Sequence, residues 1–181
     1  MNDTTFSDPA GILNNLLIRP GSTVVDIGAG MGAYSLLASE KVGDEGFVYA
    51  VEVQLSHVDH LKAFAKKESR ENLHVLWADA ELPNGTKLAD GVADSVILTN
   101  VLFTIEDKEG LVSEIKRIMK PGGQILIVEW FESFSGIGPQ DKYIVSEKFT
   151  RDIFTKNGFT LDQKIEAGSH HYGMILNNNK K

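Results

Sequence analysis

The chain contains no cysteine, and this absence excludes several kinds of chemistry. Disulfide bonds, thiolate metal sites and a cysteine nucleophile all require that residue. Chemistry on a thiophilic element such as arsenite is disfavoured for the same reason, because no thiol is present to hold it.

Long apolar runs are missing as well. The first eight residues are polar and acidic, unlike a signal peptide, and no later run is long enough to span a bilayer. We therefore expect a soluble, cytoplasmic protein.

Positive charge is scarce and is not gathered in any one segment. The 18 Lys and Arg residues stand against 25 Asp and Glu residues, which gives a formal net charge of −7. Without a basic face to follow a phosphate backbone, long nucleic acid is a poor candidate partner.

The length of 181 residues, 42% of them hydrophobic, suits one buried core and is short for two. We expect a single domain over residues 1–181, with a flexible tail at residues 1–8 and a polar tail at residues 177–181. The chain has no repeat, linker or low-complexity segment. The sequence leaves the oligomeric state open.

Runs rich in β-branched residues alternate with segments of helical period, a pattern typical of an α/β fold with a parallel sheet. The predicted strands are residues 23–27, 46–53, 73–77, 95–99 and 124–130. Apolar residues at helical spacing mark two covering helices. They are Leu55, Val58, Leu61 and Ala65 in the first, and Leu111, Ile115, Ile118 and Met119 in the second.

The two ends of the chain carry further elements. Asp8 before Pro9 predicts a helix over residues 10–18 that begins with an N-cap and a proline. Near the other end, residues 146–157 predict a helix, and Gly168-Ser169 predicts a hairpin between strands 160–166 and 172–176.

The most informative segment is a buried strand that runs straight into three glycines, Gly28, Gly30 and Gly32, and then into a helix. Glycines let the backbone approach a ligand, and the helix N-terminus offers free N–H groups. Gly28, Gly30 and Ala33 also satisfy the loose dinucleotide pattern G-x-G-x-x-A. The glycines alone therefore predict only a nucleotide-like cofactor.

Carboxylates at three consecutive strand ends narrow this prediction. Asp26 would repel the phosphates of a dinucleotide, but it can bind the amino group of a methionine moiety, directly or through water. Glu52 can accept hydrogen bonds from both ribose hydroxyls. Asp79 can accept one from an adenine amino group, although alone it would be interpreted as a helix cap or turn residue. The three together favour S-adenosylmethionine (SAM).

These residues resemble the class I SAM-dependent methyltransferases, especially the small members of the ubiquinone/menaquinone-biosynthesis-like branch. The resemblance covers residues 9–176. It rests on residues 26–32, Glu52, Asp79, the strand at residues 94–100 and the turn Lys120-Pro121-Gly122-Gly123.

The resemblance implies a Rossmann-like fold: a seven-stranded, mostly parallel sheet with an antiparallel C-terminal hairpin and helices on both faces. It implies SAM as cofactor and S-adenosylhomocysteine (SAH) as product. The glycines would line the methionine and ribose, Val53 would pack on adenine, Asp79 and Ala80 would read the adenine edge, and Asn100 would lie near the methyl-transfer opening. Residues 120–123 would be a structural turn between a helix and a strand.

Methyl transfer from a sulfonium is an in-line displacement that needs few reacting side chains, so we name no catalytic residue. A base, if the acceptor needs one, should lie beyond the carboxyl edge of the sheet. The candidates are Glu129, Glu132, Tyr143, His170 and His171. His171 titrates best near neutral pH, although strand pairing beside a hairpin also explains it. We interpret His57 and His60 as surface helix residues and predict no metal site.

The acceptor is predicted only coarsely. Trp130, Tyr143 and His171 are our candidate substrate residues, in a region where Phe131 and Phe134 add aromatic surface that core packing also explains. Gln140 and Ile144 stand where related small methyltransferases often carry a second proline and a basic residue, so their substrates are not transferred here.

Several functions stay open. A small or lipid-like acceptor is the first hypothesis, and a protein side chain is the second. An NAD-linked oxidoreductase would need a second mononucleotide half, which the sequence lacks. A SAM-binding module without catalysis is the remaining alternative.

Overall fold

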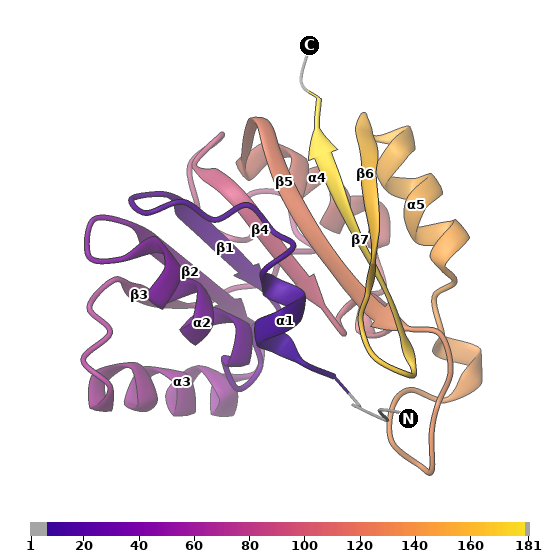
Figure 1. The fold of residues 1–181 in the computed structure, drawn as a ribbon, viewed down its shortest axis with the longest axis horizontal. Helices are drawn as coiled ribbons and strands as arrows, with labels where there is room; N and C mark the ends of the chain where they lie inside the picture. Colours follow the sequence, from indigo (N-terminus) through magenta and orange to yellow (C-terminus); the bar gives the residue numbers. More distant parts are fainter. Residues whose placement is uncertain (1–6, 180–181) are drawn as a thin grey trace.

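The structure, a computed structural model, describes residues 7–179. It contains one sheet of seven strands with helices on both faces (Figure 1). The strands are β1 (Thr23–Ile27), β2 (Phe47–Glu52), β3 (Leu73–Trp77), β4 (Ala93–Thr99), β5 (Met119–Trp130), β6 (Phe159–Glu166) and β7 (His171–Asn178). The helices are α1 (Pro9–Leu13), α2 (Ala33–Val42), α3 (Leu55–Lys67), α4 (Lys108–Ile118) and α5 (Glu147–Lys156), with 3₁₀ turns η1 (Leu102–Thr104) and η2 (Asp141–Tyr143).

The strand order is β3-β2-β1-β4-β5-β7-β6. Strands β1 to β5 pair in parallel, and β7 pairs antiparallel with both β5 and β6. The predicted sheet with its antiparallel C-terminal hairpin is therefore confirmed. The order reverses direction between β1 and β4, and ligands of open α/β sheets bind at the carboxyl ends of the strands beside such a point.

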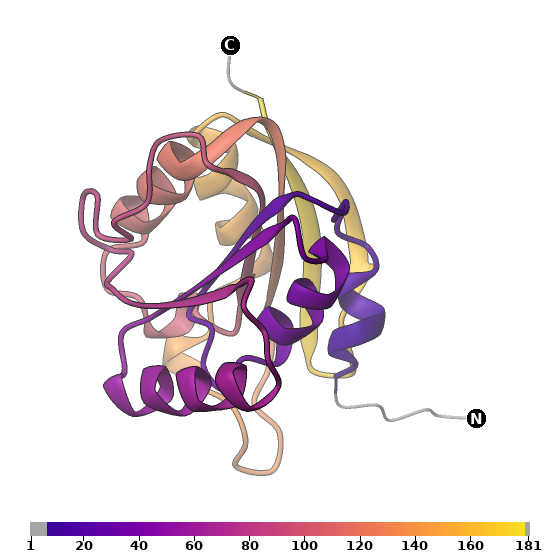
Figure 2. The same ribbon diagram turned by 90° about the vertical axis from the view of Figure 1, so that its left-hand side faces the viewer.

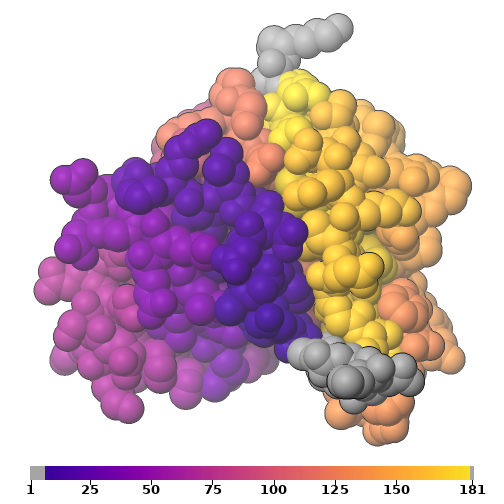
Figure 3. All heavy atoms as spheres, viewed as in Figure 1, coloured from indigo at the N-terminus to yellow at the C-terminus, as the bar shows by residue number. Residues whose placement is uncertain are grey.

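The helices form two layers, visible in Figure 2. Helices α1, α2 and α3 pack on one face of the sheet through side chains such as Leu13, Ala38 and Leu61. Helices α4 and α5 pack on the other face, where Ile115 and Phe154 are fully buried. In the space-filling view of Figure 3, the surface of α1 lies between the β1–β3 half of the molecule and the C-terminal hairpin.

The first helix is shorter than predicted. It begins at the predicted Asp8 and Pro9, but it ends at Leu13 instead of residue 18. The side-chain amide of Asn15 donates to the carbonyl oxygens of Gly11 and Ile12 at 3.2 and 3.0 Å. Such local bonds compete with the helical backbone pattern and favour a helix end.

Strand β5 begins earlier than predicted, and its start explains the Lys120–Gly123 turn. Met119 was predicted on the preceding helix, but it pairs with Ala93 of β4, and the next pair is Gln124 with Ser95. Four residues therefore bulge out of β5 opposite a single residue of β4. Gly122 carries a φ of +77° in this bulge, a backbone conformation that favours glycine.

The C-terminal tail was predicted to begin at residue 177, which is too early. Strand β7 continues to Asn178, whose buried side-chain amide donates to the carbonyl oxygens of Met119 and Lys120 at 3.2 and 3.0 Å. The pairing ties the end of the chain to the bulge of β5. Most of the predicted N-terminal tail, residues 1–6, lies outside the described residues. Among residues 7–179, no helix has the length and apolar character needed to cross a membrane.

Candidate cofactor site

A cavity of about 390 Å³ lies at the carboxyl ends of β1, β2, β3 and β4. The backbone where each strand ends is tied to a neighbouring strand. The Gly28 amide donates to the Val51 carbonyl at 2.9 Å, the Ala78 amide to Glu52 at 3.1 Å, and the Asn100 amide to Val128 at 2.9 Å. These three bonds fix the starting points of the loops that form the cavity wall.

Glu52 lines this cavity and holds the backbone around it in place. Its side chain is almost fully buried, with 5% of the residue exposed. Oε1 accepts hydrogen bonds from the Val53 and Gln54 amides at 2.9 and 2.8 Å, and Oε2 accepts one from the Gly30 amide at 2.9 Å. The carboxylate therefore holds the glycine loop of β1 against the end of β2.

Two of the glycines are needed where they stand because another side chain occupies the adjoining space. A Cβ on Gly28 would lie 2.3 Å from Cγ2 of Val101, and a Cβ on Gly32 would lie 2.2 Å from Cδ1 of Leu61. Gly28 and Gly30 line the cavity, but Gly32 does not. Gly32 instead begins α2 with a φ of +86° and lets α3 pack close to that helix.

Asp26 lies behind the glycine loop and does not line the cavity. Only 1% of the residue is exposed, and its Oδ2 accepts a hydrogen bond from the Ser35 hydroxyl at 2.6 Å. Burial raises the pKa of Asp26 to about 6; the Ser35 hydroxyl and amide partly offset this, and the charge of Glu52 adds to it. The predicted contact with the methionine amino group stays a prediction, and this position supports only an indirect one.

The remaining predicted cofactor residues do meet at the cavity: Val53, Asp79, Ala80 and Asn100 all line it. Oδ1 of Asp79 accepts from the Glu81 amide at 2.9 Å. Asn100 has a φ of +56°, which turns the chain sharply at the end of β4. Seven of the nine predicted cofactor residues thus surround one cavity, and Asp26 and Gly32 support it from behind.

Comparison with known proteins decides the family. The sequence model of a family described as methyltransferase domain matches residues 18–166. The chain belongs to this family. The predicted resemblance is thereby confirmed, and the protein is a class I SAM-dependent methyltransferase domain.

Individual relatives agree. The ubiquinone/menaquinone biosynthesis C-methyltransferase of Vibrio campbellii is 30% identical over 118 residues, which are 62% of this chain and 42% of that protein. The enzyme of the same name from Teredinibacter turnerae is 30% identical over 160 residues, 86% of this chain and 59% of that protein. The chain therefore matches less than two thirds of the length of either relative.

A solved structure matches over nearly its whole length. The SAM-dependent methyltransferase from Aquifex aeolicus gives a TM-score of 0.85 at 26% identity and covers 95% of this chain and 90% of that one. The fold of this methyltransferase domain thus has a close structural counterpart.

The candidate acceptor residues of the methyltransferase are not gathered in one pocket. Trp130 and His171 are paired across β5 and β7, and their rings lie 4.1 Å apart. Burial, followed by the charge of His170, lowers the pKa of His171. Tyr143 lies elsewhere, half-exposed, in a second cavity of about 540 Å³. Their role in acceptor binding stays a prediction.

The other candidate bases also lie outside the cofactor cavity. Nδ1 of His170 lies 2.9 Å from Oε1 of Glu132, and its ring stacks on Phe134 at 4.3 Å, so this pair connects the loop after β5 to the β6–β7 hairpin. Glu129 is buried at the end of β5 and accepts a hydrogen bond from the Trp130 amide at 2.9 Å. Burial raises its pKa to about 7, and nearby backbone amides partly offset the effect.

Two functional residues were missed at the level of sequence. Ser35 is fully buried and holds Asp26, and only its place in the first turn after the glycines could have indicated it. His57 lines the cofactor cavity beside Glu52, although the sequence suggested an ordinary surface helix. The sequence could not indicate that His57 reaches the cavity, because this depends on how α3 packs beside it.

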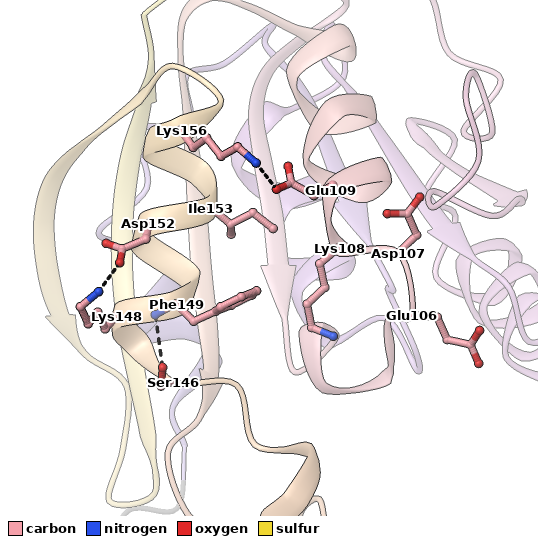
Figure 4. Close-up of a pocket in the computed structure, with 10 residues that line it drawn as sticks. All are labelled: Glu106, Asp107, Lys108, Glu109, Ser146, Lys148, Phe149, Asp152, Ile153 and Lys156. Carbon is pink, nitrogen blue, oxygen red and sulfur yellow. Dashed lines mark hydrogen bonds and ion pairs between the residues drawn. The ribbon is translucent and has the colours of Figure 1, made fainter.

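A larger groove of about 640 Å³ lies between the start of α4 and the length of α5 (Figure 4). Phe149 and Ile153 point into it from α5. The charges at its rim are largely paired, as in the contact between Lys156 and Glu109 at 2.7 Å. None of the carboxylates and glycines at the strand ends lines this groove, so we assign it no part in methyl transfer.

The two buried carboxyls predict an unusual pH dependence of stability. Their pKa values, about 7 for Glu129 and about 6 for Asp26, exceed the ordinary 4.5 and 3.8, so the folded state binds protons more tightly than the unfolded chain. This contribution is complete below the ordinary values and is lost as the pH rises through 6 to 7. One pKa unit equals about 1.4 kcal/mol, so Glu129 alone should contribute about 3 kcal/mol.

Urea unfolding of wild type and Glu129→Gln between pH 8 and pH 5 measures this effect. We expect the difference in unfolding free energy between the two proteins to change by about 3 kcal/mol over that range, in the direction that favours wild type at pH 5. His171, whose pKa is lowered, opposes the trend in both proteins equally, so the difference isolates Glu129. Parallel curves for the two proteins would contradict the prediction.

Proposed function

We propose that this domain transfers the methyl group of SAM to a small-molecule acceptor. The observation that carries the proposal is the buried carboxylate of Glu52, held beside the glycine loop in a cavity that Asp79 also lines. A carboxylate at this place accepts hydrogen bonds from a ribose, and a second one suits the adenine amino group. The cavity volume is in the range of small-molecule sites.

The residues of the chain act by binding and orientation. When bound, SAM supplies an already activated methyl group. Glu52 holds the ribose, Asp79 and Ala80 face the adenine edge, and the backbone at Gly28 and Gly30 allows close approach of the cofactor. Alignment of acceptor and methyl group lowers the barrier without a reacting side chain. We assign no base, since none of the five candidates lines the cofactor cavity.

A small acceptor is supported by three observations. The relatives named above are methyltransferases of quinone biosynthesis, and the net charge of −7 disfavours long nucleic acid. The second cavity, lined by Tyr143 and Phe149, adjoins the cofactor cavity through the shared residues 103–105. Its volume also suits a small molecule. A cytoplasmic location stays a proposal that rests on composition alone.

Methyl-labelled SAM tests this proposal. The protein is incubated with the label and a cell extract, which is then separated into a low-mass fraction and a macromolecular fraction. We expect label in the low-mass fraction, at least about tenfold above an identical reaction with Glu52→Ala, because that variant should lose the cofactor. Label in the protein fraction would instead support the alternative of a side-chain methyltransferase. Absence of transfer to any fraction would contradict both.

A further inference from the structure

The groove between the start of α4 and the length of α5 is the feature from which we infer a further binding site (Figure 4). It shares Lys108, Ser146 and Phe149 with the second cavity, which in turn shares residues 103–105 with the cofactor cavity. The shared walls place the three spaces in a row. A molecule whose reacting end lies beside the cofactor cavity can therefore extend through the second cavity into the groove.

Apolar side chains line this row where it passes α5. Phe149 lines both the second cavity and the groove, and Ile153 lines the groove one turn further along the helix. Figure 4 shows both side chains pointing into the groove. Ile153 is buried, but 48% of Phe149 is exposed, and Tyr143 in the second cavity is 51% exposed. Both rings therefore keep apolar surface that a ligand can bury.

The charged residues of the groove offer no free counter-ion to a ligand. Three lysines and four carboxylates line it, and each lysine already has a partner. The partners are the Ile105 carbonyl for Lys108 at 2.6 Å, Asp152 for Lys148, and Glu109 for Lys156 at 2.7 Å. Of the other two carboxylates, Asp107 caps α4, and Glu106 points away from α5 in Figure 4. A charged ligand group would lose water here without gaining a partner.

We propose that this groove binds an uncharged, apolar part of the acceptor, and that Phe149 determines specificity at its entrance. The acceptor is then an elongated molecule, with the reacting group at one end and an apolar extension at the other. The groove takes no part in the transfer itself and contributes affinity by burying apolar surface. This inference rests on the proposed function, because it presupposes methyl transfer at the cofactor cavity.

An uncharged fluorescent probe, N-phenyl-1-naphthylamine, tests the groove without any turnover. Its fluorescence rises in apolar sites, so titration of the full chain should show saturable binding. Straight-chain 1-alkanols should displace it, with an affinity that rises about fourfold for each added methylene group. Alkyl carboxylates and alkylammonium ions of the same length should displace it at least about tenfold less well, because their charges have no partner in the groove.

Phe149→Ser and Phe47→Ser form a matched pair of variants. Phe47 is 45% exposed, close to the value for Phe149, but it begins β2 at the opposite edge of the sheet from the cofactor cavity. Phe149→Ser should bind the probe and the alkanols about tenfold more weakly, because the ring that they cover is gone. Phe47→Ser should bind them like wild type. Both variants should keep the wild-type affinity for SAH, which shows that they are folded.

A transfer reaction connects the groove with the acceptor. With methyl-labelled SAM and cell extract, we expect the labelled low-mass product to pass into octanol at neutral pH, because its extension is apolar and uncharged. Phe149→Ser should form about tenfold less of this product than Phe47→Ser at limiting extract. More extract should narrow the difference, since a lost binding contact raises KM and leaves kcat unchanged.

The contrary results are distinguishable. If the probe does not bind, or if it binds Phe149→Ser as tightly as wild type, the groove is not an apolar site, and the proposed function stands where SAH still binds. Equal displacement by the charged alkyl compounds overturns the assigned polarity. If the product stays in water, or if both variants form it equally well, the groove does not bind the acceptor. If folded wild type binds no SAH and transfers no label, the proposed function fails and the inference fails with it.

Discussion

Replacing Glu52 with alanine is expected to raise the dissociation constant for SAH by about 100-fold. A hydrogen bond to a charged group contributes about 1.5–3 kcal/mol, and about 1.4 kcal/mol corresponds to a factor of ten. The substitution removes the proposed ribose acceptor and also leaves the amides of Gly30, Val53 and Gln54 without their partner. Calorimetric titration with SAM and SAH measures the change, and NADH serves as the ligand that should not bind.

The control for this experiment is Glu68→Ala. Glu68 follows α3, where its nearest ion-pair partner, Lys67, is 4.0 Å away, and it lies outside the cofactor cavity. Its removal should change neither affinity nor fold. Binding by folded Glu52→Ala within about threefold of wild type would contradict the assigned role. Binding of NADH in place of SAM by wild type would return the oxidoreductase alternative to first place.

The largest loss of stability is expected from Glu114→Ala. Glu114 lies on α4, nearly fully buried, and accepts five hydrogen bonds at 2.6 to 3.1 Å. The donors are the amides of Asn84 and Thr86, the Thr86 hydroxyl and two nitrogens of Arg117. Removing one partner of a buried ion pair costs about 3–5 kcal/mol. Arg117 keeps Asp90 and the Leu88 carbonyl as partners, so we expect the lower end of that range. We expect a melting temperature lower by about 10 °C.

The loss of folding stability at acidic pH gives an independent measure of what Glu114 contributes. Burial alone would raise the pKa of Glu114, but the hydrogen bonds from Arg117 and Thr86 outweigh it and lower the pKa to about 2. A carboxyl with a lowered pKa stabilises the fold above its ordinary value of 4.5, and this stabilisation is lost as the pH falls towards 2. Wild type should therefore lose stability over that range, and Glu114→Ala should lose less.

The matched variant is Glu109→Ala, on the same helix. It breaks the contact with Lys156, in which both side chains are more than half exposed, and surface pairs contribute about 0–1 kcal/mol. Urea unfolding should place this variant within that range of wild type. If Glu114→Ala also stays within about 1 kcal/mol, the network does not hold the β3–β4 connection to α4 as described.

Most of the fold was predictable because strands and helices bury apolar side chains with different periods. Strands β1 and β3 match their predicted bounds, since each is a short, largely apolar run that follows a turn residue, Ser22 for β1 and Asn72 for β3. The errors fall where a side chain or a tertiary contact overrides local pattern. Asn15 helps to end α1, and the pairing of Met119 with Ala93 draws a helix-like residue into β5.

The residues of the candidate site likewise fall into those that the sequence could predict and those that it could not. Glu52, Asp79 and Asn100 could be placed because each lies at or just after the end of a strand, and parallel strands end at one edge of the sheet. The depth of Asp26 below the glycine loop and the approach of His57 depend on how α2 and α3 pack on the sheet, which no sequence period records. Trp130 and Tyr143 were predicted together because both are aromatic and lie around the loop after β5, but neither residue type nor place in the sequence records the path of a long loop.

The amide-to-carbonyl bonds at the ends of β1, β3 and β4 have an evolutionary consequence. Such bonds are made by the backbone, so most substitutions leave them intact, and the half of the molecule that we propose holds the methyl donor should tolerate sequence drift at positions other than Gly28, Gly32 and Glu52. The segment between β5 and α5 depends more on side-chain contacts, such as Phe134 with His170. Under the proposed function, in which the cavity beside Tyr143 takes the acceptor, replacement of that segment is expected to exchange one acceptor for another while the donor half stays the same, which makes it the natural unit for recombination between homologues or for grafting in the laboratory.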